Sequence, residues 1–276
     1  MKRIIVSLVL LTSSALAAEN AIELQGLQGL GDIRHHQVES DIIGKRYELL
    51  VGLPASYTAS PGAKYPTVYL TDGAALYPLL QAYYRYLNFG EEVPEAIFVA
   101  ISYSDGDWVN GNDRSHDYSA PSDAREDYGG ARDFQAMLRD EVLPLIETRY
   151  RARPDRRIIF GQSMGGQFVL YTALTQPDLF WGHIASNPAL HNNVSFFLPA
   201  AAKVPASPGS KLYVASASDD DARFKVPAMQ WIRAWSEQQE KPWELHAEIL
   251  DGHNHYSAPP ASFRAGMKFL FQQASP

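Results

Sequence analysis

Two short runs of the chain, Ala96–Ile101 and Ile158–Phe160, are almost entirely apolar and do not alternate with polar residues. A strand with this pattern is buried on both faces, as parallel strands in the centre of a sheet are. Strands are also predicted at 46–53, 65–70, 183–185, 211–215 and 244–250. Because helical patterns separate the middle runs, the sequence predicts an α/β fold, with a mostly parallel central sheet and helices on both faces.

The longest helical pattern precedes the second of these runs. Its apolar residues recur three or four positions apart along one stripe, and they are Phe134, Met137, Leu138, Val142, Leu145, Ile146 and Tyr150. Pro144 lies inside the pattern and has no backbone N–H, so a kink or a break is expected there. Further helices are predicted at 164–175 and 226–238.

Residues 1–18 have the layout of a secretory signal peptide, with basic Lys2 and Arg3, an apolar run and small residues before the cleavage site after Ala17 or Ala18. The apolar run is shorter than the roughly 20 residues that a membrane-spanning helix needs. We therefore expect a periplasmic or secreted protein without a membrane span, in which residues 19–276 form a single domain.

The chain is acidic and lacks cysteine. Its formal charge is −7, and loss of the two positive charges of Lys2 and Arg3 with the signal peptide makes it −9. An acidic surface without a basic cluster does not favour nucleic acid as a partner. The absence of cysteine excludes a disulfide scaffold, a thiolate nucleophile and Cys-based metal sites.

Ser163 lies between Gly161 and Gly165 in the stretch RIIFGQSMGGQFVLYTAL. A buried strand before the serine, a sharp turn at it and a helix directly after it form the arrangement that a nucleophile elbow needs. Larger residues than the two glycines would collide with the neighbouring strand and helix. The amide of Met164 lies at the start of the predicted helix, where it can stabilise an oxyanion.

A serine hydroxyl needs a base, and in this fold an acid and then a histidine follow the serine along the chain. His253 and His255 both satisfy that order, in the segment ILDGHNHYSAPPASF. A metal-binding His-x-His pair is less favoured, because no carboxylates lie nearby at matched spacing. The acid is one of Asp219, Asp220 and Asp221, which follow a predicted strand but also suit an exposed loop or the start of a helix.

A second oxyanion donor is expected from the loop after an early strand, which reads YLTDGAALYP. Gly73 lets the backbone turn there, so the amide of Ala74 is the predicted donor, although Asp-Gly is also common in plain turns.

With these motifs in place, the chain resembles the Putative esterase family of α/β-hydrolases, which contains siderophore esterases and feruloyl esterases. The resemblance covers most of residues 19–276. It is carried, in this order, by YPTVYLTDGAALYP, DRSHDYSAPSD, EVLPLIETRYRARPDRRIIFGQSMGGQFVLYTAL, FWGHIASNPALH and DGHNHYSAPPASFRAGMKFLF.

The resemblance implies that Ser163 is the nucleophile and that His255, which precedes a Ser/Pro-containing turn and the last helix, is the base. The family's acid follows a glycine at a strand end; Ala217 stands at that place here, which points to Asp220, with Asp219 next. Some siderophore esterases of the family work with a serine–histidine pair, so the resemblance leaves the need for an acid open. Arg114, Asp117 and Tyr118 match a family loop, R-x-x-D-Y, that is either structural or substrate-facing.

The resemblance implies an exported serine esterase that acts on a small-molecule ester, such as a siderophore ester or a feruloyl-type ester, without a metal or an organic cofactor. The alternatives are a serine peptidase or an acyltransferase of the same fold, or a non-catalytic binding protein. A binding protein would be expected to have lost Ser163 or the histidine.

Aromatic side chains either line the substrate pocket or pack in the core. The candidates are Tyr77, Tyr83, Tyr84, Tyr86, Trp108, Tyr118, Trp181, Phe196 and Phe197.

Overall fold

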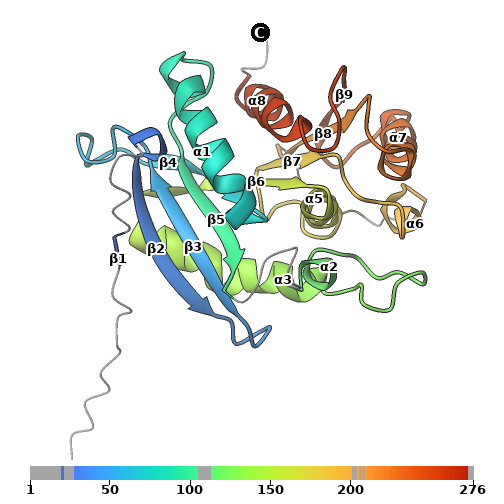
Figure 1. The fold of residues 1–276 in the computed structure, drawn as a ribbon, viewed down its shortest axis with the longest axis horizontal. Helices are drawn as coiled ribbons and strands as arrows, with labels where there is room; N and C mark the ends of the chain where they lie inside the picture. The colour runs from blue at the N-terminus through green and yellow to red at the C-terminus, as the bar shows by residue number, and fades with distance from the viewer. Residues whose placement is uncertain are drawn as a thin grey trace, which may run out of the picture.

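The computed structural model describes residues 20–21, 28–104, 113–200, 204, 207 and 209–272. The predicted signal peptide and Trp108 lie outside these residues. The strands and helices form a layered α/β structure (Figure 1). The strands are β1 (Asn20–Ala21), β2 (Asp32–Glu39), β3 (Arg46–Leu53), β4 (Tyr65–Leu70), β5 (Ile97–Tyr103), β6 (Ala152–Gln162), β7 (Gly182–Ser186), β8 (Lys211–Ala217) and β9 (Glu244–Leu250).

All of these strands belong to one sheet, in the order β1-β2-β3-β5-β4-β6-β7-β8-β9. The pairs from β1 to β5 along this order are antiparallel, and every pair from β5 to β9 is parallel. The predicted α/β-hydrolase architecture is therefore present. Because parallel strands present their carboxyl ends at one edge, the segments after β4, β6, β8 and β9 meet there.

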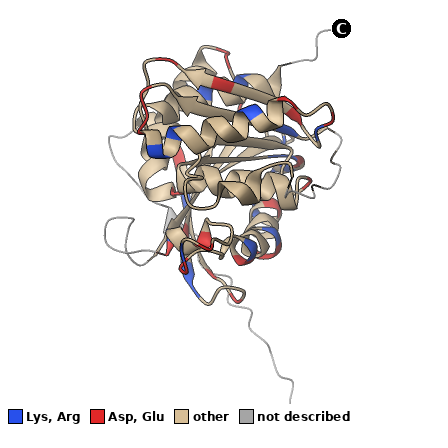
Figure 2. Cartoon of the chain, turned by 90° about the vertical axis from the view of Figure 1, so that its right-hand side faces the viewer, with Lys and Arg blue, Asp and Glu red and all other residues tan. Residues whose placement is uncertain are grey.

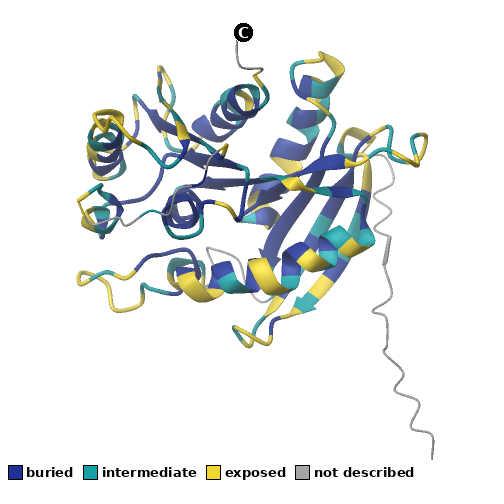
Figure 3. Cartoon of the chain, turned by 180° about the vertical axis from the view of Figure 1, so that it is seen from behind, coloured by how far each residue is buried: buried dark blue, intermediate teal, exposed yellow. Residues whose placement is uncertain are grey.

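The helices cover both faces of the sheet. They are α1 (Gly73–Phe89), α2 (Arg114–Asp117), α3 (Ala131–Met137), α4 (Leu143–Arg149), α5 (Met164–Thr175), α6 (Val194–Phe197), α7 (Ala222–Ser236) and α8 (Ala258–Phe271). Helices α1 and α8 pack with one face of the sheet, whereas α3, α4, α5 and α7 pack with the other. Figure 3 shows the buried central strands between helices whose outer sides are exposed.

Strand β5 shows why the apolar runs do not alternate. Val99 packs in the core on the side of α5, and its neighbours Phe98 and Ala100 pack in the core on the side of α1. Both faces of the strand are buried, so every position favours an apolar residue.

The helical pattern with Pro144 is irregular, as expected. A single π-helical turn, Leu138–Val142, separates α3 from α4, and Pro144 lies in the first turn of α4. A proline is tolerated in a first turn because its missing N–H would have no intrahelical partner there.

Charged residues of both signs are interspersed over the loops and helices visible in Figure 2. Within the part of the chain that the structure describes, no helix is both long enough and apolar enough to span a membrane.

His183 introduces a polar ring into this apolar core. It lies in β7, is fully buried, and makes no hydrogen bond of good geometry through either ring nitrogen, although the backbone of Lys211 lies close enough to favour the protonated form slightly. Burial lowers the pKa of His183 from 6.5 to about 4, because desolvation penalises the imidazolium.

The folded protein should therefore lose stability as the pH falls from 6.5 towards 4. In that window the unfolded chain binds a proton at His183 that the folded chain does not, so the full stability is present above pH 6.5 and declines below it. The loss amounts to about 3 kcal/mol at pH 4. Urea unfolding of the wild type and of His183→Met at a series of pH values should show a shallower acid decline in the variant, and parallel curves would contradict the assignment.

Candidate active site

Ser163 occupies a strained turn between β6 and α5. Its φ and ψ angles are 60° and −115°, a conformation that non-glycine residues rarely adopt. Gly161 and Gly165 make this turn possible: a Cβ on Gly161 would lie 2.2 Å from the backbone of Gly165, and a Cβ on Gly165 would lie 2.2 Å from Oγ1 of Thr71 in β4's continuation. The turn is tight because the backbones before and after Ser163 touch.

Hydrogen bonds fix the backbone of this turn. The amide of Ser163 donates to the carbonyl of Ser186 at the end of β7, at 3.0 Å. The carbonyl of Ser163 accepts from the amides of Gln167 and Ala189, at 2.9 and 3.0 Å. Hydrogen bonds to α5, to the end of β7 and to the residues just after β7 therefore hold the backbone of Ser163 in its strained conformation at the carboxyl end of the sheet.

His255 and Asp220 form a buried pair beside the turn. Nδ1 of His255 lies 2.8 Å from Oδ2 of Asp220, and the two side chains are 13% and 1% exposed. Oδ1 of Asp220 accepts the amide of Asp221 at 2.7 Å. A buried carboxylate on Nδ1 fixes the ring orientation and leaves Nε2 as the nitrogen that can accept a proton.

The other candidates for acid and base face elsewhere. Asp219 accepts the hydroxyl of Ser218, and the exposed Asp221 caps α7 by accepting the amide of Arg223. Nδ1 of His253 lies 3.1 Å from the carbonyl of Ser257 within its own loop. Of the five predicted acid and base residues, only His255 and Asp220 are joined through their side chains. Asp219 and His253 meet through the backbone, where the amide of Asp219 donates to the carbonyl of His253 at 2.9 Å.

Ser163 and His255 line one cavity of about 320 Å³. Its wall combines apolar, aromatic and charged side chains, namely Asp72, Ala75, Leu76, Leu79, Arg114, Gln162, Ser163, Arg223, Phe224, His255, Tyr256 and Pro259. The serine that carries the hydroxyl and the histidine that carries the imidazole therefore border the same space.

Neither of the predicted oxyanion donors, Met164 and Ala74, is among the residues that line this cavity. Met164 is buried and is the first residue of α5, whose first-turn amides have no carbonyl partner within the helix. Ala74 lies in the first turn of α1 but is exposed, and it is not among the residues that line the cavity. The left-handed residue of this loop is Asp72, with φ of 52°, whereas Gly73 is needed because a Cβ there would lie 2.7 Å from the backbone of β5. The two donor roles stay predictions.

Comparison with known proteins identifies the family. Residues 40–262 match the family described as Putative esterase, and they cover most of the chain and all of the site. The chain belongs to this family.

Two curated relatives are siderophore esterases by name. The ferri-bacillibactin esterase BesA of Bacillus subtilis is 32% identical over 168 residues, which are 56% of this chain and 57% of that protein. The siderophore triacetylfusarinine C esterase of Aspergillus fumigatus is 31% identical over 129 residues, 45% of this chain and 44% of that protein. The chain thus matches about half the length of these relatives.

A crystal structure of the BES protein from Bacillus cereus has the same fold. Its TM-score is 0.74 at 21% sequence identity, and the match covers 87% of this chain and 95% of that chain.

The family loop R-x-x-D-Y has both a structural part and a part that faces the cavity. Asp117 is buried and accepts hydrogen bonds from Lys45, Tyr47 and Tyr103, at 3.2, 2.9 and 3.0 Å. Arg114 lines the cavity and binds the carboxylate of Asp72 through two hydrogen bonds of 2.7 Å. Burial alone would lower the pKa of Arg114, but the charge and hydrogen bonds of Asp72 outweigh it and raise the pKa above its ordinary value.

The conformation of Asp72 is fixed by this loop. Its carboxylate is held by Arg114, and its amide donates to the hydroxyl of Tyr118 at 3.2 Å. The left-handed backbone of Asp72 is therefore stabilised by a half-buried ion pair with Arg114. Through this pair, the R-x-x-D-Y loop fixes the position of Asp72 in the wall of the cavity. Sequence reasoning missed Asp72 because nothing in an Asp-Gly turn indicates which partner will bind the aspartate.

None of the aromatic candidates that the structure describes lines the cavity, and the alternative, that aromatic residues pack in the core, is confirmed for four of them. Tyr77, Tyr84, Tyr118 and Phe197 are buried in the core instead. The aromatic wall consists of Phe224 and Tyr256, and the ring of Phe224 is stacked on His255 with 4.3 Å between centroids and 24° between planes. Tyr256 directly follows the predicted base, which is the one signal that could have identified it.

Gln162, between Gly161 and Ser163, was also missed. Its Nε2 donates to the carbonyl of His255 at 2.8 Å, so the residue before the serine holds the histidine loop in place.

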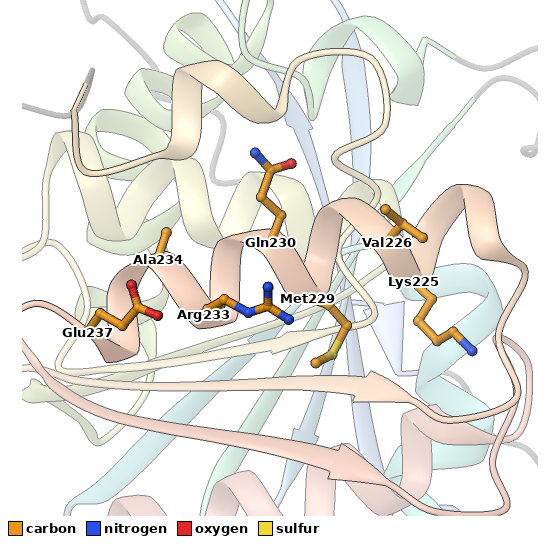
Figure 4. A pocket seen from close by; sticks show the side chains of 7 residues that line it. All are labelled: Lys225, Val226, Met229, Gln230, Arg233, Ala234 and Glu237. Atoms are coloured by element: carbon orange, nitrogen blue, oxygen red, sulfur yellow. The ribbon is translucent and has the colours of Figure 1, made fainter.

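A larger hollow of about 580 Å³ lies along the outer side of α7 and has a different character (Figure 4). Its lining is Lys225, Val226, Met229, Gln230, Arg233 and Ala234 of this helix and Glu237 directly after it. It contains neither Ser163 nor His255, both of which line the smaller cavity.

Proposed function

We propose that the protein is a serine esterase that hydrolyses a carboxylic ester through an acyl-enzyme intermediate. The observation that carries the proposal is the shared cavity, which is lined both by a serine on a strained elbow and by a histidine paired with a buried aspartate. Membership of the esterase family supports it.

In the first step, Nε2 of His255 removes the hydroxyl proton as Oγ of Ser163 attacks the ester carbonyl. The carbonyl π electrons move to the oxygen, and the resulting oxyanion is stabilised by amides at the start of α5 and, in our assignment, of Ala74. Collapse of the tetrahedral intermediate breaks the bond to the alcohol oxygen, which takes the proton from His255.

In the second step, water gives a proton to His255 and attacks the acyl-serine. The bond between the acyl carbon and Oγ then breaks, Ser163 regains the proton, and the carboxylic acid leaves. Asp220 stabilises the imidazolium that forms transiently in both steps. No cofactor enters this sequence.

We further propose that the ester belongs to a siderophore or to a similarly aromatic acyl compound. The names of the two curated relatives support a siderophore ester, and Phe224, Tyr256 and Leu79 supply an apolar wall for an acyl group. About 320 Å³ is at the lower end for small-molecule pockets, so one ester arm enters and the rest of a large substrate stays outside. Export through residues 1–18 stays a prediction from the sequence.

The test combines active-site labelling with turnover. Purified wild-type protein should react with a fluorophosphonate probe and hydrolyse p-nitrophenyl butyrate, and Ser163→Ala should lose both properties while keeping its circular dichroism spectrum. A panel of ferri-bacillibactin, triacetylfusarinine C, a feruloyl sugar and short-chain esters then ranks substrates by kcat/KM. Wild-type protein that neither labels nor turns over any ester would refute the proposal.

A further inference from the structure

The ring of Phe224 is the centre of a cluster of groups that are or can become cations. The imidazole of His255 is stacked on it at 4.3 Å, the guanidinium of Arg223 lies over it at 4.4 Å, and the ring of His191 meets it edge-on at 5.2 Å. Phe224 lies in the first turn of α7, four residues after Asp220, which binds Nδ1 of the same imidazole. One short segment therefore contacts His255 twice, at a ring nitrogen and over a ring face.

We propose that Phe224 is a positioning residue for the base, and that its π face stabilises the imidazolium of His255 during acyl transfer. The inference rests on the proposed function for its kinetic readout, and it goes further by assigning a role to a residue outside the serine, histidine and aspartate.

The geometry fits this role in two ways. An aromatic face carries partial negative charge and attracts a cation whose centre lies within about 6 Å of the ring centroid, and the stacked imidazole meets that condition. The stack also restricts rotation of the imidazole, because Asp220 fixes one edge and Phe224 covers one face. Both effects act when His255 gains its proton in the transition state.

Other charged groups act on the same imidazole and must stay constant in the test. Asp220 binds it from the loop after β8, and His191, in the segment after β7, is close enough for an electrostatic interaction with it. Arg223 of α7 lies over the ring of Phe224 and lines the same cavity as His255. Asp219 and Asp221 line the adjoining hollow behind Phe224. A substitution at Phe224 changes none of these charged side chains, but it also removes the ring contacts of Arg223 and His191.

Phe224→Leu keeps an apolar side chain of similar size but removes the π face. We expect kcat for p-nitrophenyl butyrate to fall about five- to thirtyfold, the range that a partly desolvated cation–π contact supports, with KM changed less than about twofold. Phe224→Tyr should restore kcat to within about twofold of the wild type. The matched control is Phe196→Leu, which removes a half-buried ring stacked on Tyr171 at 5.8 Å outside the cavity, and should leave kcat unchanged.

The pH profile separates this role from simple packing. Loss of the π face makes the imidazolium less stable, so the acid limb of kcat/KM against pH should move to lower pH in Phe224→Leu. The same displacement is expected in an NMR titration of the His255 imidazole, assigned by its absence in His255→Gln. That titration needs no catalysis, so it tests the stack even if the wild type hydrolyses no ester.

Three results would overturn the inference. One is a raised KM in Phe224→Leu with kcat and the acid limb unchanged, which would make Phe224 a wall of the cavity only. Another is an equal loss of kcat in Phe196→Leu, which would show a general packing effect. The third is an unmoved His255 titration in Phe224→Leu.

Discussion

Replacing His255 with alanine should lower kcat for ester hydrolysis by at least about 10⁴-fold, because loss of one member of a serine–histidine unit costs nearly as much as loss of the whole unit. Without an imidazole next to the cavity, Ser163 keeps its proton and is a weak nucleophile. The measurement is steady-state hydrolysis of p-nitrophenyl butyrate, with far-ultraviolet circular dichroism and thermal unfolding to show that the variant is folded.

The matched control for this prediction is two residues away. His253 binds within its own loop and does not line the cavity, so His253→Ala should keep kcat within about threefold of the wild type, as surface substitutions usually have small effects. If His253→Ala were inactive and His255→Ala active, the base would have been assigned to the wrong histidine.

Gly161→Ala should disrupt the elbow itself. The added Cβ would lie 2.2 Å from both the carbonyl carbon and the oxygen of Gly165, and these are backbone atoms that cannot rotate away. We expect the free energy of unfolding to fall by about 3 kcal/mol or more, the upper part of the range for overpacking. Any folded fraction should have a reduced kcat, because the backbone must move where Ser163 is held. Urea unfolding and kcat per folded molecule measure the two effects.

Gly62→Ala is the corresponding control. A Cβ on Gly62 meets nothing within 4 Å, and its φ is not in the left-handed region. The stability of this variant should equal or slightly exceed that of the wild type, since alanine reduces the entropy of the unfolded chain. Equal behaviour of the two glycine variants would contradict the proposed packing of the elbow.

Much of the sheet and one of its helices could be predicted from the sequence. The strands β3, β4 and β9 and the helix α5 have the predicted bounds. These elements carry strong local signals: apolar runs of strand length, or a glycine-rich turn followed by a helical pattern. Strand β2 was missed because its sequence, DIRHHQVE, is mostly polar and buries few of its side chains.

The site could be predicted only in part. The order of residues along the chain indicated Ser163 and two histidines, but it did not choose among three adjacent aspartates. That choice depends on the direction of each side chain in one turn: Asp220 points to His255, whereas Asp221 caps α7. The bond between Arg114 and Asp72 and the stack of Phe224 on His255 join segments far apart in the sequence, so no local pattern reports them.

The hydrogen bond from Gln162 to the carbonyl of His255 joins residues 93 positions apart, across the ends of β6 and β9. During synthesis the nucleophile turn is completed well before the last strand of the sheet exists. Until β9 pairs with β8 and its loop reaches Gln162, the chain carries a serine without a proton acceptor. A nascent or truncated chain that ends before this loop therefore lacks the proposed base, and the site is complete only once β9 and the loop after it are in place.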